Sequence, residues 1–433
     1  MALAPLVNDE PAGARRANFA GRMTKHEEEV PRTASERQGR LQVLRDRKMA
    51  ATAHAFVRAS SRLFYETIAE QRRALPSGPA IWISGDCHAE NFGAVSDARG
   101  EGDLEMNDLD EATVGEPAHD LLRLALSLSM AARAAGRNGL DTAAMLDAMT
   151  RGYDGLLRQR EKGEALVVDE PSARLRKLER HAAARSRSEL LDGRCPEVGG
   201  RRAFPMGPRY WPLSQAERRA VEALVGSAEV SALVTTLAGI DRHEALEIVD
   251  LAFRVAGTGS LGAFRVAALV SVGEQGKKHH DQDLRLLDVK EAQPTQAPRV
   301  AGAHVPKDDA ERVVHGARAL SPPIGGRLLA ATLEGMPVVV RELLPQEDKV
   351  SVDGLEHDEA CAVARHLGGI LGRAHARQLD VHDAKGWRAS FGDERDVGAP
   401  PRWLWSALVP IVGRHEAAYL EHCGALAARK EAK

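Results

Sequence analysis

The sequence predicts an α+β fold in which a large helical part and a smaller β-rich part occupy separate stretches of the chain. Apolar residues recur at a helical period before residue 250 and again after residue 356. Residues 251–345 instead contain short apolar runs separated by turns, which is typical of antiparallel strands. The chain has 433 residues, of which 43% are apolar and 28% charged, so it can bury a sizeable core.

Four segments follow from this pattern. Residues 1–45 are polar and charge-rich and form an N-terminal arm. Residues 46–250 make the helical part, and residues 251–345 make the sheet, which one helix near Asp309–Leu320 interrupts. Residues 346–433 are helical again and complete the helical part.

Composition excludes several classes of protein. The formal net charge is −3, which argues against a general nucleic-acid coat or a polybasic membrane anchor. The four cysteines form no C-x-x-C pair, so neither a zinc ribbon nor a disulfide scaffold is expected. No apolar run approaches the roughly 20 residues that span a bilayer. We expect a cytoplasmic protein without a membrane or nucleic-acid partner.

The first candidate site begins where a short strand, residues 80–83, meets the polar run GDCHAENFG. Asp86 and Asn91 stand five residues apart in this run, and Asp108 follows in NDLD after a second strand-like piece. Phosphoryl transfer needs a carboxylate near the acceptor hydroxyl and oxygen ligands for Mg²⁺. These two loops carry such a set, although Asp and Asn also cap turns and helices.

The two loops resemble the catalytic and metal loops of the aminoglycoside-phosphotransferase branch of the protein-kinase-like superfamily. The usual pattern is H-G-D-x-H-x-x-N, followed by an aspartate that precedes a helix-start aspartate by twelve residues. Asp108 and Asp120 have this spacing, whereas Asp110 lies two residues too close to Asp120. The resemblance implies that Asp86 is the catalytic base, that Asn91 and Asp108 are metal ligands, and that Asp120 is structural.

Two residues of the first loop need separate comment. Ser84 stands where the family usually has histidine, which affects support of the loop rather than its chemistry. His88 is a candidate catalytic residue, either as a brace for the loop or as a proton carrier.

The second candidate site is the run Gly257-Thr258-Gly259-Ser260-Leu261-Gly262, which fits both dinucleotide loops and kinase glycine loops. A dinucleotide loop opens a helix, but the following AFRVAALV predicts a strand. We therefore expect a β-hairpin whose turn covers a nucleotide, with Gly257, Gly259, Ser260 and Gly262 as cofactor-binding residues.

Further nucleotide-binding residues are expected downstream. Lys290 ends an apolar strand, as the lysine of V-A-I-K does, and Glu311 begins a helix from which it could pair with Lys290. Each has a plainer interpretation, a solvent-facing strand lysine and an acid favoured by the helix dipole. Glu342 and Leu343 follow an apolar strand and would form the hinge that binds adenine through its backbone.

The catalytic loop precedes the glycine loop, which reverses the order in kinases, so we expect a protein-kinase-like two-lobed fold that is circularly permuted. This arrangement, with KMAATAHAFVRA, VKEAQP, ERVVHGAR and GRAHARQLD, resembles an uncharacterised bacterial family, domain of unknown function 2252, over most of residues 40–380. The family's R-M-x-x-S-P-F-x-F-x-R-G is only partly matched, because Thr52-Ala53-His54 replaces S-P-F and Ala59 replaces the glycine.

The expected function is an ATP- and Mg²⁺-dependent phosphotransferase acting on an unknown hydroxyl acceptor, a small molecule rather than a protein. The alternatives are a pseudokinase that binds nucleotide and a partner protein, and a metal-dependent phosphoesterase. An arginine-rich stretch at residues 172–188 stays outside this scheme. It is interpreted as a solvated helix face, with an anion- or acceptor-binding segment as the alternative.

Overall fold

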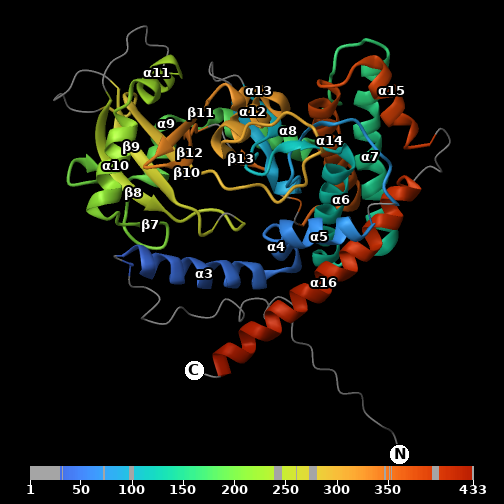
Figure 1. Ribbon diagram of the computed structural model, residues 1–433, viewed down its shortest axis with the longest axis horizontal. Helices are drawn as coiled ribbons and strands as arrows, with labels where there is room; N and C mark the ends of the chain where they lie inside the picture. Colours follow the sequence, from blue (N-terminus) through green and yellow to red (C-terminus); the bar gives the residue numbers. More distant parts are fainter. Residues whose placement is uncertain are drawn as a thin grey trace, which may run out of the picture.

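Figure 1 shows a computed structural model of the chain, in which helices and an antiparallel sheet lie side by side. The structure describes most of the chain from residue 30 onward. The described residues are 30–31, 33–71, 74–96, 102–237, 246–259, 261–272, 280–345, 348–350, 352, 354–392 and 399–431.

The helical part is built around α6, α7 and α14. Helix α6 has a proline in its first turn and is buried along almost its whole length. Helices α7 and α14 approach closely because glycines face each other's backbone. A Cβ on Gly368 would lie 1.9 Å from the Met149 carbonyl oxygen, and one on Gly152 would lie 1.9 Å from that of Arg365. The helices of this part are α5 (Ser61–Gln71), α6 (Pro117–Ala134), α7 (Gly139–Glu161), α14 (His357–Ala376), α15 (Val381–Ala389) and α16 (Arg402–Glu431).

The expected β-rich part is a six-stranded antiparallel sheet in the order β11-β12-β10-β9-β8-β7. Its long strands are rich in valine, leucine and alanine, the composition that predicted them. The strands are β7 (Tyr210–Trp211), β8 (Glu247–Arg254), β9 (Arg265–Ser271), β10 (Leu284–Glu291), β11 (Leu328–Leu333) and β12 (Met336–Glu342).

The two faces of this sheet have different neighbours. Because side chains alternate along a strand, Leu287 and Val289 of β10 lie on one face. They share a core there with valines of α10 (Gln215–Val225) and α11 (Ala228–Leu237). Leu284 and Leu286 lie on the other face, under α9 (Arg187–Arg194), which follows α8 (Ala173–Ala184). This second face also carries Asp288 and Lys290 and is therefore the face that bears on function.

Helix α12 spans Asp309–Leu320, as the sequence predicted, and is followed by the short α13 (Pro322–Gly325). The boundary expected at residue 251, between the helical part and the β-rich part, falls inside β8. The β-rich part begins earlier, because β7 belongs to the sheet and α10 and α11 pack against it. Strand β7 was not predicted, because a two-residue strand shows no detectable alternation of apolar and polar residues.

Two small sheets support the polar loops. Strand β1 (Ile81–Ile83) pairs with β4 (Thr113–Gly115), which confirms the strand expected before GDCHAENFG. A short 3₁₀ turn, η2 (Ala89–Asn91), leads into β2 (Phe92–Ser96), which pairs with β3 (Gly102–Met106) and β13 (Asp348–Lys349). A separate hairpin joins β5 (Glu197–Val198) to β6 (Arg201–Arg202).

The N-terminal helices α3 (Ala34–Ala51) and α4 (Ala53–Val57) link the sheet to the helical part (Figure 1). Arg37 of α3 donates to the Pro212 carbonyl beside β7, and Arg123 of α6 donates to the Val57 carbonyl at the end of α4. Residues 1–29 of the expected arm lie outside the described residues. No single described helix is long and apolar enough to cross a membrane, although α10 and α11 together pass this test as a bent pair.

Candidate functional site

The loop between β1 and η2 is held in a fixed shape by hydrogen bonds to its backbone. Asp120, buried in the first turn of α6, accepts from the Ser84 amide at 2.7 Å and from the Gly85 amide at 3.0 Å. The Tyr65 hydroxyl donates to the Gly85 carbonyl at 2.6 Å. Gly85 has a φ of +74°, and a Cβ there would lie 2.2 Å from the Glu111 carbonyl oxygen. Position 85 therefore requires glycine, and the fixed backbone there sets the position of Asp86, the next residue.

Asp86 is paired with a buried arginine. Arg123 of α6 donates from Nε to Asp86 Oδ1 at 2.7 Å, and its guanidinium stacks over Phe64. The Arg123 side chain is fully buried, whereas 18% of the Asp86 side chain is exposed. Burial raises the pKa of Asp86, and Arg123 opposes that rise. A carboxylate with a raised pKa accepts a proton more readily, as a general base must.

His88 lies behind this carboxylate. Its Nε2 is 3.8 Å from Asp86 Oδ2, and the residue is buried. Burial, and then the positive charges of Arg123 and Arg58, hold the pKa of His88 well below its usual range. A histidine held neutral in this way braces the loop rather than carrying protons near neutral pH.

Asn91 and Asn107 present two buried amide oxygens beside the acidic loop. The Asn91 amide donates to the Asp86 carbonyl at 2.9 Å, and the Asn107 backbone donates to the Asn91 carbonyl at 2.8 Å. The Oδ1 atoms of both asparagines are buried and have no hydrogen-bond partner. Buried oxygens without partners are costly in a folded protein, and amide oxygens are suitable ligands for Mg²⁺.

Asp108 follows Asn107 and is surrounded by positive charge. Burial opposes ionisation of this carboxyl, but Lys290, Lys349 and Arg265 outweigh it and lower the pKa of Asp108 to about 2. Asp108 is therefore ionised at all physiological pH values. Its carboxylate and the amide oxygens of Asn91 and Asn107 are of the kinds that a hard divalent cation prefers as ligands. Among the described residues, no group of three or more His, Cys, Asp or Glu is placed to hold a metal.

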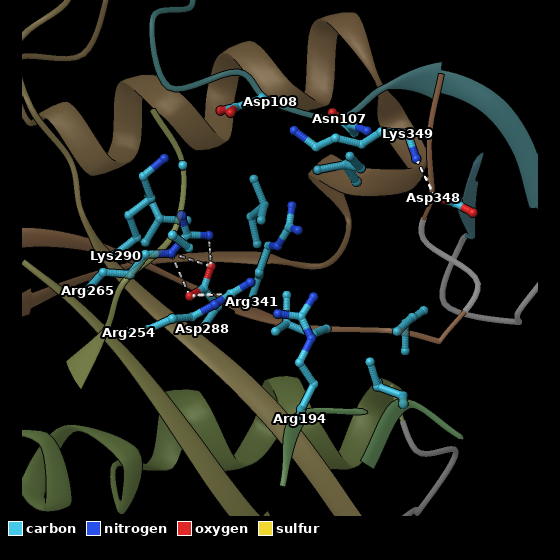
Figure 2. Close-up of a pocket in the computed structure, with 18 of the residues that line it drawn as sticks. Asn107, Asp108, Arg194, Arg254, Arg265, Asp288, Lys290, Arg341, Asp348 and Lys349 are labelled. Atoms are coloured by element: carbon cyan, nitrogen blue, oxygen red, sulfur yellow. Dashed lines mark hydrogen bonds and ion pairs between the residues drawn. The ribbon is translucent and has the colours of Figure 1, made fainter. Parts of the chain in front are cut away.

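A cavity of about 580 Å³ lies between this acidic loop and the second face of the sheet (Figure 2). Its volume suits a ligand of nucleotide size. Apolar side chains from α12, α13, β11, β12 and the residue after β12 form one side, namely Val313, Ile324, Leu328, Val339 and Leu343. Seven basic and five acidic side chains also line it: Arg185, Arg194, Arg254, Arg265, Lys290, Arg341, Lys349, Asp108, Asp110, Glu189, Asp288 and Asp348. The lining thus carries a positive surplus in a chain whose net charge is −3.

The glycine run forms the turn expected of it. Strands β8 and β9 pair antiparallel, and the described residues between them, 255–259 and 261–264, contain no helix. Gly257 and Gly262 have φ of +84° and +118°, and Gly257 lines the cavity. The Lys48 ammonium donates to the Gly257 carbonyl at 2.7 Å, so α3 holds this turn from outside. A Cβ added to Gly259 would lie 3.3 Å from the Arg58 carbonyl oxygen. Ser260 lies outside the described residues.

Lys290 faces the cavity, as expected, but its ion-pair partner is not the predicted one. It pairs with Asp110, and Glu311 lies exposed in the first turn of α12. The expected Lys290–Glu311 pair is therefore wrong in this structure. Arg312, the next residue of α12, is buried and donates to the Asp110 and Ala112 carbonyls at 2.9 and 2.6 Å. The helix thus presents Arg312, rather than Glu311, to the acidic loop.

The predicted hinge is also only partly right. Leu343 lines the cavity, but Glu342 does not, because alternation along β12 places Glu342 on the opposite face. The Glu342 carboxylate pairs with Arg187 at 3.0 Å, and its carbonyl accepts from Arg327 at 2.8 Å. The Leu343 amide donates to the Leu286 carbonyl at 2.8 Å. The Glu342 carbonyl is therefore already bonded to an arginine side chain, and the Leu343 amide is already bonded to the neighbouring strand.

Three cavity or loop residues had no signal in the sequence. Lys349 lies on a two-residue strand, which has no sequence pattern. Arg123 lies one helical turn after Asp120, on a helix whose sequence predicts a buried core helix. Arg194 ends α9, beyond the arginine-rich stretch 172–188, and no spacing in the sequence distinguishes it from surface arginines. Each was visible only through its position in space.

Comparison with known families places the chain in one of them. The sequence pattern of DUF2252, a family described as an uncharacterized protein conserved in bacteria, matches residues 37–425. The chain belongs to this family. The match includes the acidic loops, the glycine turn, the whole sheet and most of α16, so the cavity lies within the family's common region. Neither a curated protein nor a solved structure matched the chain.

Proposed function

We propose that this member of the DUF2252 family is an ATP- and Mg²⁺-dependent phosphotransferase that acts on a hydroxyl group of a small molecule. The observation that carries the proposal is that Lys290 and Asp108, far apart in sequence, line one cavity from opposite sides. A lysine that neutralises phosphates and a carboxylate that holds Mg²⁺ must both reach the same triphosphate.

The order of elements supports a permuted kinase-like arrangement. From β8 onward, a glycine turn lies between the first two strands, a lysine lies on the third, and a helix and two further strands follow. Kinases likewise have a glycine-rich loop, then a lysine on the third strand, then a helix. In this chain the catalytic loop precedes all of these elements instead of following them.

Each residue has a defined task in this proposal. When bound, MgATP supplies the transferable phosphoryl group, with Mg²⁺ neutralising charge on the phosphates. Asp108 and the free amide oxygens of Asn91 and Asn107 would hold the metal. Asp86 orients the acceptor hydroxyl and takes its proton, and the neutral His88 fixes the loop. Lys290 would exchange Asp110 for phosphate oxygens.

One contact favours the alternative of a nucleotide-binding pseudokinase. Asp86 is already engaged by Arg123, so an acceptor hydroxyl competes with an ion pair for the carboxylate. The contact of the second carboxylate oxygen is with the neutral His88 at 3.8 Å, which is too long for a hydrogen bond, so this oxygen can accept from an acceptor hydroxyl. Turnover, rather than nucleotide binding, separates the enzyme from the pseudokinase.

Thermal unfolding of the full chain with ATP or GTP, and with Mg²⁺ or Mn²⁺, tests nucleotide binding. A ligand at 100 times its dissociation constant stabilises the native state by about 2.7 kcal/mol, which is a readily measured shift. The proposal predicts a rise in melting temperature that requires both nucleotide and metal, and that Asp108→Ala reduces. No shift at millimolar MgATP would contradict it.

A further inference from the structure

Three arginines lie beside one carboxylate on the cavity wall opposite Asp108, and a fourth lies nearby (Figure 2). Asp288 of β10 accepts from Arg265 Nε at 2.8 Å and pairs with Arg254 at 2.8 Å. Arg341 faces Asp288 across the β10–β12 pairing. Arg194 reaches toward them from the end of α9. We call Arg194, Arg254, Arg265 and Arg341 the arginine cluster.

The arginine cluster carries more positive charge than its surroundings balance. Asp288 is 2% exposed and is shared by at least two of the arginines. Arg194 has no carboxylate partner among the residues that the structure describes, whereas Arg254 and Arg265 pair with Asp288 and Arg341 lies beside it. Burial, with Arg265 and Arg194 nearby, lowers the pKa of Arg254 despite Asp288. Such an excess of partly buried positive charge is unfavourable unless an anion is bound.

The position of the cluster separates it from the Lys290–Asp108 pair. Asp288 and Lys290 lie two residues apart on the same face of β10, which corresponds to roughly 7 Å. Lys290 itself faces Arg265 across the β9–β10 pairing, and like charges directly opposite destabilise a sheet. Asp288 and the arginines beside it make this part of the cavity wall charged.

We propose that the arginine cluster is a second anion-binding subsite of the cavity, which takes a phosphate group of a ligand. Guanidinium groups bind phosphate through paired hydrogen bonds, and four of them converge on one small volume. The phosphate belongs either to the nucleotide or to an anionic acceptor. The subsite rests on the charges and contacts of the cavity and stands apart from the proposed phosphoryl transfer.

Isothermal titration of the full chain with inorganic tripolyphosphate, without Mg²⁺, tests the subsite. Arg194→Ala is the informative variant, because Arg194 is half-buried and its loss leaves no carboxylate unpaired. Arg180→Ala is the matched control, an exposed arginine on the neighbouring helix α8. Because Arg194→Ala removes one charge-assisted contact, we expect its affinity for tripolyphosphate to be roughly tenfold to hundredfold weaker. The affinity of Arg180→Ala is expected to be unchanged. Equal affinities for the two variants would overturn the subsite.

A second titration identifies the source of the phosphate. If the nucleotide supplies it, Arg194→Ala weakens binding of MgATP and of tripolyphosphate to a similar degree. If an acceptor supplies it, MgATP affinity is retained, and Arg194→Ala abolishes pyrophosphate binding to protein already saturated with MgATP. Dependence of tripolyphosphate binding on Arg194 in a protein that binds no nucleotide would refute the proposed function while supporting the subsite.

Discussion

Asp86 and Asp108 are both partly buried aspartates of the same candidate site, yet their pKa values move in opposite directions. Asp86 has one cation, Arg123, against a larger cost of burial, so its pKa rises. Asp108 has Lys290, Lys349 and Arg265, which together outweigh burial and bring its pKa to about 2. The first carboxylate is therefore suited to accept a proton, and the second to remain a charged ligand.

The role of Asp86 is tested by Asp86→Asn. We expect kcat to fall by roughly 10²–10⁴, the usual scale for a positioned acid–base group, with MgATP affinity within a few-fold of the parent. Initial rates and a nucleotide titration provide the two numbers. Asp383→Asn, at an exposed position on α15, serves as the control. A variant that turns over like the parent would remove Asp86 from the mechanism.

The opposite pKa shifts predict the pH profile of kcat/KM. Asp86 works only when ionised, so activity is lost as the pH falls through its raised pKa, above the ordinary value of about 3.9. Asp108 remains ionised until about pH 2 and contributes no limb in the working range. The pKa of His88 lies well below its usual range, so His88 is not expected to produce an acid limb near 6.5. An acid limb that persists unchanged in Asp86→Asn would instead assign the proton transfer to another group.

Asp108 and Asp110 are distinguished by Mg²⁺ titration at fixed ATP. Asp108→Ala removes a proposed ligand, so a much higher Mg²⁺ concentration is needed for half-saturation. Asp110→Ala removes a partner of Lys290 and leaves the proposed ligands in place, so a smaller change is expected. A larger effect at Asp110 would exchange the two assignments.

At the scale of elements, the sequence predicted the helices and strands that have a sustained apolar period or a distinctive turn sequence. Helix α12 and the hairpin around Gly257 were correctly placed, since each combines a strong pattern with a clear start or turn signal. The side-chain partners were harder to predict. The difference between Glu311 and Arg312 facing the acidic loop is a rotation of about 100° on a helix, which composition does not specify.

The shape of the catalytic loop depends on Gly85. Gly85→Ala is expected to destabilise the protein by at least about 1 kcal/mol, because an alanine resists positive φ and its Cβ would collide with the Glu111 carbonyl. Gly386→Ala is the control, since this glycine lies inside α15 with open space around it. That change is expected to stabilise by about 0.5–1 kcal/mol. Urea unfolding measures both, and equal effects would contradict a constrained loop.

At the scale of the whole molecule, the cavity joins segments that are distant in sequence. The motifs predicted that Lys290 and Asp108 would meet, because both were assigned to one triphosphate. Contacts that no motif describes could not be predicted. Asp110 reaches Lys290, Arg123 reaches Asp86, and α9 brings Arg194 over the sheet. Such contacts depend on how helices pack, which the local pattern does not determine.

The central claim is transfer of the terminal phosphoryl group of ATP, and isotope transfer tests it most directly. The full chain is incubated with Mg²⁺ and a small-molecule extract of bacterial cells, using ATP labelled at the γ-phosphate or at the α-phosphate. The account predicts an Asp86-dependent product labelled from the γ-phosphate and not from the α-phosphate. Label transferred from the α-phosphate, or none from either position, would contradict it.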